Sequence, residues 1–261
     1  MDSLPQSLRH QLRRGRDLSR AERRSPAPPL ATAVPVLDRA LGGGLPRGAT
    51  VELIGHRSSG RFAAVVETLA AVTRVGEAAA LVDLGDHLDP RLAEVAGVCL
   101  ERLLWLRPRR LKEALKSTEM LLDSGFPLVV LDLGEPPVGG RGAEAFWLRL
   151  SRAAQARRAA LLVSSPYRIS GSGAEAVLEL RRRRPCWRGT GPAPRLLAGL
   201  GSRLRLAKVR HGHPGGEETW QLGAPAVPWA STWDPAPRRS ASLTPRQVEH
   251  IPDPLPVAAA G

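Results

Sequence analysis

The stretch VELIGHRSSGRF, residues 51–62, decides the fold that we expect for this chain. It has the frame of a phosphate-binding loop, G-x-x-x-x-G-K-[ST], in which backbone N–H groups hold phosphates, the lysine reaches the β- and γ-phosphates and the hydroxyl holds Mg²⁺. Gly55 and Gly60 keep this frame, but Arg61 replaces the lysine and Phe62 replaces the Ser or Thr. Arginine can still pair with phosphate, whereas phenylalanine cannot ligate Mg²⁺. The loop therefore predicts a nucleotide-type fold that binds rather than hydrolyses.

The composition favours a bacterial cytoplasmic protein with acidic partners. The net charge is +13 over 261 residues and is carried almost wholly by arginine. Such a charge favours nucleic acid or an acidic protein surface as a partner. A GC-rich genome explains arginine in place of lysine, but not the excess of positive charge. The two cysteines, Cys99 and Cys186, form neither a metal motif nor a disulfide framework. We expect no membrane span and no signal peptide, because the apolar runs are too short.

Three segments follow one another along the chain. Residues 1–33 form a basic N-terminal arm, residues 34–223 an α/β domain and residues 224–261 a Pro-rich tail. Spaced leucines in the arm predict either an amphipathic helix over residues 5–20 or an arm without regular structure. The tail has no periodic apolar pattern, so we expect it to be flexible, with polyproline II character.

Within residues 34–223, apolar runs alternate with amphipathic stretches. The predicted strands are 51–54, 79–82, 103–106, 128–131, 160–163, 176–180 and 204–209. The predicted helices are 35–41, 61–73, 89–95, 112–123 and 143–158. Such alternation predicts βαβ units and a mainly parallel sheet. The last two strands have no helix between them, which predicts an antiparallel extension at one edge.

Three stretches resemble the core of the bacterial RecA recombinase. They are VLDRALGGGLPRGATVELIGHRSSGRF from residue 36, LVDLGDHLDPRLAEVAGV from residue 81 and FPLVVLDLGEPP from residue 126. The last of these resembles the Walker B strand, with Asp132 at its carboxyl end. The order and spacing of the three stretches carry the resemblance, which runs from about residue 34 to residue 223. It implies a RecA-like P-loop core.

The chain departs from RecA at the positions that carry its chemistry. Where RecA-type ATPases have a water-activating glutamate, this chain has Gly85, with Asp86 next to it. Residues 164–166, Ser-Ser-Pro, replace the Asn-Gln pair that senses the γ-phosphate. The counterparts of the DNA-binding loops, 135–142 and 167–173, are short. Together these losses predict a RecA-like fold without RecA chemistry.

This combination is similar to the ImuA family, RecA-like accessory proteins of bacterial translesion synthesis and distant relatives of SulA. The resemblance implies a non-catalytic adaptor in damage-induced mutagenesis, with an ImuB-type Y-family polymerase homologue as partner. An error-prone DnaE-type polymerase would be an indirect partner, and RecA and single-stranded DNA are further candidates. No cofactor is expected. Two alternatives stay open: a slow DNA-stimulated ATPase that uses Arg61, Asp86 and Asp132, and a SulA-like inhibitor of cell division.

The candidate phosphate site is degenerate and contains no expected metal ligand set. Its residues are Gly55, Ser58, Ser59, Gly60, Arg61 and Asp132. Arg61 either binds a phosphate at a helix N-terminus or lies unused on the surface. Asp132 ends a buried strand, and we expect it to pair with a nearby arginine as a structural carboxylate.

Two basic clusters are candidates for contact with nucleic acid or a protein partner. The larger contains Arg181, Arg182, Arg183, Arg184, Trp187 and Arg188, and the smaller contains Arg107, Arg109 and Arg110. Arginines beside an aromatic residue suit phosphate contact combined with base stacking. A solvated loop or a salt-bridged edge strand is an equally good interpretation of the larger cluster. The histidines of HGHPGG, residues 211–216, are expected in a hairpin turn rather than a metal site.

Overall fold

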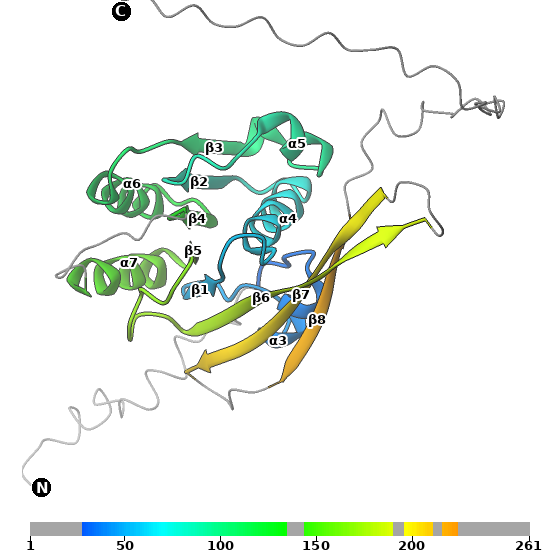
Figure 1. The fold of residues 1–261 in the computed structure, drawn as a ribbon. Coiled ribbons are helices and arrows are strands. Elements are labelled where there is room, and N and C mark those ends of the chain that lie inside the picture. Colours follow the sequence, from blue (N-terminus) through cyan, green and yellow to red (C-terminus); the bar gives the residue numbers. More distant parts are fainter. Residues whose placement is uncertain (1–27, 135–143, 190–195, 211–215, 224–261) are drawn as a thin grey trace, which may run out of the picture. The chain divides into compact units, whose positions relative to one another are not determined.

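The computed structural model describes residues 28–134, 144–189, 196–210 and 216–223. All of them belong to one compact unit, Met1–Pro225, and the second unit, Ala226–Gly261, lies outside the described residues. The predicted arm helix, the loop 135–142, most of the histidine turn and the Pro-rich tail also lie outside them. Figure 1 shows the described part as a sheet covered by helices.

One eight-stranded sheet organises this part of the chain, in the order β3-β2-β4-β5-β1-β6-β7-β8. The strands are β1 (Thr50–Ile54), β2 (Ala79–Asp83), β3 (Leu103–Leu106), β4 (Leu128–Asp132), β5 (Ala160–Ser165), β6 (Ala176–Arg188), β7 (Leu196–Val209) and β8 (Glu217–Gly223). The pairings from β3 to β6 are parallel, and β6–β7 and β7–β8 are antiparallel. The predicted α/β fold, with its mainly parallel sheet and antiparallel edge, is confirmed.

Helices cover both faces of the parallel part of the sheet. They are α3 (Pro35–Ala40), α4 (Arg61–Arg74), α5 (Pro90–Val95), α6 (Leu111–Asp123) and α7 (Glu144–Arg157), with a 3₁₀ turn η1 (Leu100–Arg102). Side chains alternate between the faces of each strand. Leu162 therefore packs in the cluster with α3, α4 and α5, and Leu161 in the cluster with α6 and α7. Within the described ranges no helix is long and apolar enough to cross a membrane.

The folded unit begins before the domain start that the sequence suggests. Leu30 is buried, and its backbone bridges to Leu45 through two hydrogen bonds of 2.9 and 2.8 Å. Gly44 permits this approach, because a Cβ at that position would lie 2.2 Å from the carbonyl oxygen of Leu30. Thr32 is fully buried and donates its hydroxyl to Asp38 at 2.7 Å. Residues 28–33 are thus part of the α/β domain rather than of a separate arm.

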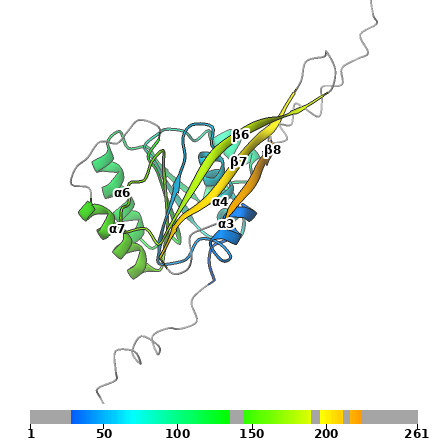
Figure 2. The same cartoon turned by 60° about the horizontal axis from the view of Figure 1, so that its bottom comes forward.

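The antiparallel edge is longer than the sequence suggests. The sequence predicts that β6 ends at residue 180 and β7 begins at residue 204, with the arginines 181–184 beyond the strand or in a salt-bridged edge strand. Instead β6 continues through these arginines to Arg188, β7 begins at Leu196, and β8 adds a further strand that the sequence did not indicate. Figure 2 shows the three strands extending away from the helices. The arginines interrupt the apolar alternation that indicates a strand in a sequence. An exposed strand does not need this alternation when its neighbouring strand supplies the backbone hydrogen bonds.

Candidate functional site

Parallel register brings the polar ends of three strands together. Asp83 of β2 is the direct neighbour of Asp132 of β4, and Asp132 is the neighbour of Ser164 of β5. Neighbouring strands lie about 4.8 Å apart, so these three side chains meet at one edge of the sheet. The loop 55–60 follows β1 at the same edge, where ligands of open α/β sheets bind.

The loop 55–60 has the backbone of a tight strand-to-helix turn. Ser58 and Gly60 have positive φ angles of 58° and 89°, and Gly60 is the N-cap of α4. Gly55 has no room for a side chain, because a Cβ would lie 2.4 Å from Ser59 Oγ and 2.7 Å from the Leu180 carbonyl oxygen. The glycines of the motif therefore have a steric reason to be present.

Arg61, the first residue of α4, turns inward and fills the centre of the site. Its Nε donates to the carbonyl of Gly55 at 3.0 Å and its Nη2 to that of Gly134 at 3.1 Å. Its Nη1 donates to Asp132 Oδ1 at 2.8 Å and also to Ser164 Oγ. The Arg61 side chain is 3% exposed and that of Asp132 is 0% exposed. The surface alternative for Arg61 is wrong, and the predicted arginine partner of Asp132 is confirmed.

The two buried carboxylates are surrounded by donors. Asp132 Oδ2 accepts from His87 Nδ1 at 2.9 Å. Asp83 accepts from the backbone N–H groups of His87 and Leu88, at 3.1 and 3.0 Å, and from the indole N–H of Trp105 at 3.2 Å. Because buried charges are stable only when they are paired and hydrogen-bonded, this cluster is balanced when both Arg61 and His87 are cationic.

Ligand atoms of Asp83, His87 and Asp132 lie within 4.8 Å of one another, close enough to surround a cation. The donor set fits a cation poorly, however. The oxygens of Asp132 already accept from Arg61 and His87, and the Arg61 guanidinium would repel a second positive charge. Phe62 contributes no ligand, since its ring stands edge-on to the His87 imidazole with centroids 5.3 Å apart.

Known proteins are similar to this chain in fold and, over part of its length, in sequence. The crystal structure of the RadB recombinase superposes with a TM-score of 0.56 and 20% identity, covering 74% of this chain and 95% of that chain. Residues 20–134 match the model of the RecA N-terminal domain. The RecA protein of Clavibacter michiganensis subsp. michiganensis is 40% identical over 114 residues, and that of Tropheryma whipplei is 42% identical over 98 residues.

The domain has a RecA-like fold, and its first part is similar to RecA in sequence. The RadB likeness shows the fold alone, while the family match covers the segment from the arm to the end of β4 and includes the phosphate-loop frame. The matches cover 43% of this chain for the Clavibacter protein and 37% for the Tropheryma protein. The chain spans at most about a third of these relatives, 32% and 22% of their lengths.

The RecA-like domain leaves no space for a side chain at Gly85. A Cβ there would lie 2.5 Å from Gly134 Cα and 2.7 Å from His87 Cε1. The neighbouring Asp86 is exposed and accepts from Arg107 Nε and Nη2 at 2.6 and 2.7 Å, which holds the pKa of Asp86 below its usual range. The carboxylate that the sequence offered as a substitute base is thus held by an arginine outside the buried cluster.

Two cavities flank the loop of the RecA-like domain. One of about 450 Å³ lies between the loop and β6, and its lining includes His56, Arg57, Ser59 and Arg182. The other, of about 360 Å³, lies over the start of α4, lined by residues that include His56, Arg57, Phe62 and His87. The outer side of the loop therefore remains open, although Arg61 closes its inner side.

The structure does not bring the two basic clusters together. Arg107, Arg109 and Arg110 follow β3 at the carboxyl edge, as expected, but four strands separate β3 from β6 in the sheet order. Arg107 also lies over the Trp105 ring at 4.9 Å. Any single ligand would have to use one cluster or cross the whole carboxyl edge.

Glu52 is a structural residue of the site that sequence reasoning missed. It is fully buried in β1 and accepts from the backbone N–H groups of Ile169 at 2.5 Å and Ser170 at 3.2 Å. It also accepts from the Ser170 hydroxyl. Glu52 therefore holds the segment after β5 against β1. Its signal in the sequence was a carboxylate inside an otherwise apolar strand.

The environment of His87 makes the cluster sensitive to pH. The hydrogen bond to Asp132 raises the pKa of His87 above its usual value, and the negative charges of Asp132 and Asp83 act in the same direction. Burial and the positive charge of Arg61 oppose this increase. A raised pKa means that the folded protein binds the proton more tightly than the unfolded chain does.

We therefore expect the protein to lose stability as the pH rises through the pKa of folded His87. The contribution is complete below the unfolded value, about 6.5, and is lost above the raised folded value. Urea denaturation from pH 6 to pH 9 would measure it, with His87→Gln as the comparison. The variant should show a flatter dependence over this range. Parallel curves for the two proteins would show that His87 does not carry the effect.

Proposed function

We propose that this protein is a RecA-like adaptor of the ImuA type, which supports DNA-damage-induced mutagenesis without hydrolysing ATP. The observation that carries the proposal is the buried guanidinium of Arg61, which binds Asp132 and Ser164 at the centre of the site. These are the positions that resemble the Walker B carboxylate and the γ-phosphate sensor. Arg61 thus satisfies, from within the protein, the groups that a nucleotide and its metal would otherwise contact.

The energetics support a binding role over a hydrolytic one. For Mg²⁺ to reach Asp132, the Arg61 guanidinium would have to leave its buried partner. Separating a buried ion pair costs about 3–5 kcal/mol, because it leaves an uncompensated charge. No hydroxyl at residue 62 is present to recover this cost as a metal ligand.

The partners follow from the same resemblance. We propose an ImuB-type Y-family polymerase homologue as the direct partner, an error-prone DnaE-type polymerase as an indirect one and RecA as a further one, all in the bacterial cytoplasm. Support comes from the similarity to RecA proteins over the segment 20–134 and from the net charge of +13. Capture of an ImuB-type protein by the purified chain tests this part. Capture of a cell-division protein instead would favour the SulA-like alternative.

The test of the catalytic part is nucleotide binding and hydrolysis by the purified protein with Mg²⁺, with and without single-stranded DNA. We expect no turnover above a protein-free control, and a bacterial RecA measured in parallel shows that the assay works. The double variant Arg61→Lys/Phe62→Thr restores the two motif residues. ATP turnover by this variant would show that the site lacks only these two groups. If the wild-type protein hydrolysed ATP, and folded Arg61→Ala or Asp132→Asn variants did not, the RecA-type ATPase would become the favoured function.

A further inference from the structure

The loop 55–60 and β6 border a cavity that the proposed function does not use. Its volume is about 450 Å³, and its lining comes from the end of β1, the loop, Pro166 and residues 179–182 of β6. These four residues of β6 are consecutive, whereas side chains on one face of a strand belong to alternate residues. The cavity therefore runs along the edge of β6 rather than over one of its faces.

β6 has an unpaired backbone edge beside this cavity. β1 pairs with β6 only as far as Glu179, opposite Ile54, while β7 stays paired with β6 as far as Arg188. In the part of the chain that the structure describes, no strand pairs with the other edge of β6 from Arg181 onward. Pro185 lies in this stretch, and proline within a sheet is confined mainly to such edges. Free backbone N–H and C=O groups of this kind can accept a further extended chain.

The hydroxyl of Ser59, in the lining of the cavity, has no hydrogen-bond partner. Ser59 is 2% exposed, and its Oγ is one of two buried side-chain polar atoms without a partner among the described residues. Its backbone carbonyl, in contrast, accepts from the hydroxyl of Ser202 on β7, which stands opposite Arg182 in the sheet. This bond fixes Ser59 beside β6. A buried hydroxyl without a partner is destabilising, so one in the lining of a cavity indicates a ligand that accepts a hydrogen bond.

Two cations of the lining have no anionic partner. Arg181 binds Glu179, the one carboxylate of the lining, at 2.7 Å. Among the described residues, no carboxylate pairs with Arg57 of the loop or with Arg182, and both side chains are exposed. The cavity thus offers two guanidinium groups and one hydroxyl to a ligand group that is negatively charged.

We infer that this cavity binds an extended acidic segment of a partner protein. A carboxylate of the segment pairs with Arg57 and Arg182 and accepts from the Ser59 hydroxyl, and the main chain of the segment adds to the free edge of β6. The inference deepens the proposed function and rests on it, because an adaptor needs a surface for its protein partner. It names the chemistry of that partner, and nucleotide hydrolysis has no part in it.

An acidic peptide uses all the features of the site. Guanidinium groups bind carboxylates and phosphates alike, so charge alone does not choose between a peptide and a nucleic acid. The free strand edge does choose, because a peptide main chain has the repeating N–H and C=O groups that pair with it. A second copy of β6 is a poor occupant, since the four successive arginines, 181–184, would repel those of the copy.

The test measures the fluorescence anisotropy of a short labelled peptide of alternating glutamate and valine residues at physiological ionic strength. We expect Arg57→Gln/Arg182→Gln to weaken binding about tenfold or more, because hydrogen bonds between charged groups are lost. The same peptide with glutamine in place of glutamate should bind the wild type as weakly. Methylation of alternate backbone nitrogens in the acidic peptide should also weaken binding, since it blocks addition to the strand edge.

Ser59→Ala gives a second readout. It should raise the Tm of the free protein, because it removes a buried hydroxyl without a partner, and it should weaken peptide binding by about threefold to tenfold. A lowered Tm with unchanged affinity would show that the Ser59 hydroxyl serves the fold rather than a ligand, and would contradict its assigned role.

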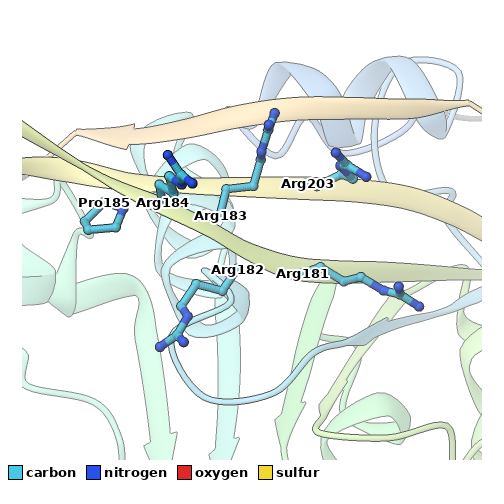
Figure 3. A pocket seen from close by; sticks show the side chains of 6 residues that line it. All are labelled: Arg181, Arg182, Arg183, Arg184, Pro185 and Arg203. Atoms are coloured by element: carbon cyan, nitrogen blue, oxygen red, sulfur yellow. The ribbon is translucent and has the colours of Figure 1, made fainter.

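The matched control, Arg183→Gln/Arg184→Gln, removes the same charge from the same strand. These two arginines do not line the cavity, and Figure 3 shows them pointing away from Arg182. The control should stay within about twofold of the wild type, because salt screens charges outside the contact. Thermal melts confirm that each variant is folded. An equal loss in this control, or unchanged binding in Arg57→Gln/Arg182→Gln, would overturn the inference. Tighter binding of a labelled oligothymidylate than of the peptide, lost in Arg57→Gln/Arg182→Gln, would assign the site to phosphates and overturn it too.

The failures of the two proposals are distinguishable. ATP turnover, together with peptide binding that depends on Arg57 and Arg182, would refute the non-hydrolytic function alone. Absence of turnover, with full capture of the proposed polymerase homologue by Arg57→Gln/Arg182→Gln, would refute this inference alone.

Discussion

Asp132→Ala is expected to lower the free energy of unfolding by about 3–5 kcal/mol. The substitution removes a buried carboxylate that the guanidinium of Arg61, only 3% exposed, binds at 2.8 Å. It also removes the acceptor of the Ser164 hydroxyl and of His87 Nδ1. For a domain of this size the loss corresponds to a fall in Tm of roughly 10 °C. Urea denaturation and thermal melts of the purified variant measure it.

Two further variants separate the charge from the packing. Asp132→Asn keeps an acceptor oxygen and should lose less stability than Asp132→Ala. The double variant Arg61→Met/Asp132→Leu removes both charges together, and it should recover much of the loss, because an apolar pair of similar volume needs no compensation. A loss below about 1 kcal/mol for Asp132→Ala would mean that Arg61 leaves the cluster easily, and the site would then be open to a nucleotide.

Glu52→Ala is expected to cost about 3 kcal/mol and to release the segment after β5. The backbone N–H groups of Ile169 and Ser170 would lose their buried acceptor, together with the Ser170 hydroxyl. A buried donor without a partner costs about 1–3 kcal/mol. Hydrogen exchange of the Ile169 and Ser170 amides should accelerate strongly, while exchange in β2 and β4 should change little.

Glu94→Ala is a suitable control for this result, since Glu94 is an exposed glutamate on α5. It should leave both stability and exchange near the wild-type values. Glu52→Gln retains one acceptor oxygen, so it should fall between the two. Uniformly faster exchange across the sheet in Glu52→Ala would contradict a local role and would indicate that Glu52 supports the whole strand order.

The regular part of the fold was predictable because it rests on local patterns. Strands covered on both faces are apolar throughout, as in LVVL of β4, and buried strands of this kind are visible in a single sequence. The glycines of the loop 55–60 were also informative, because the backbone of a tight turn requires glycine itself, independently of contacts with distant residues. β6, β7 and β8 were predicted only in part. Their outer halves gain strand structure from one another, and their own residues give no apolar alternation.

The sequence by itself determined the loop frame, the two replaced motif residues, the mainly parallel sheet and the need of Asp132 for a positive partner. The tertiary structure alone decided that this partner is Arg61, since the loop after β1 places the first residue of α4 at the sheet edge where Asp132 and Ser164 meet. It also decided which arginines are paired, because Glu179 and Glu217 reach Arg181 and Arg203 but not Arg182, Arg184 or Arg188. Both outcomes depend on contacts between residues far apart in the chain, which no local pattern records.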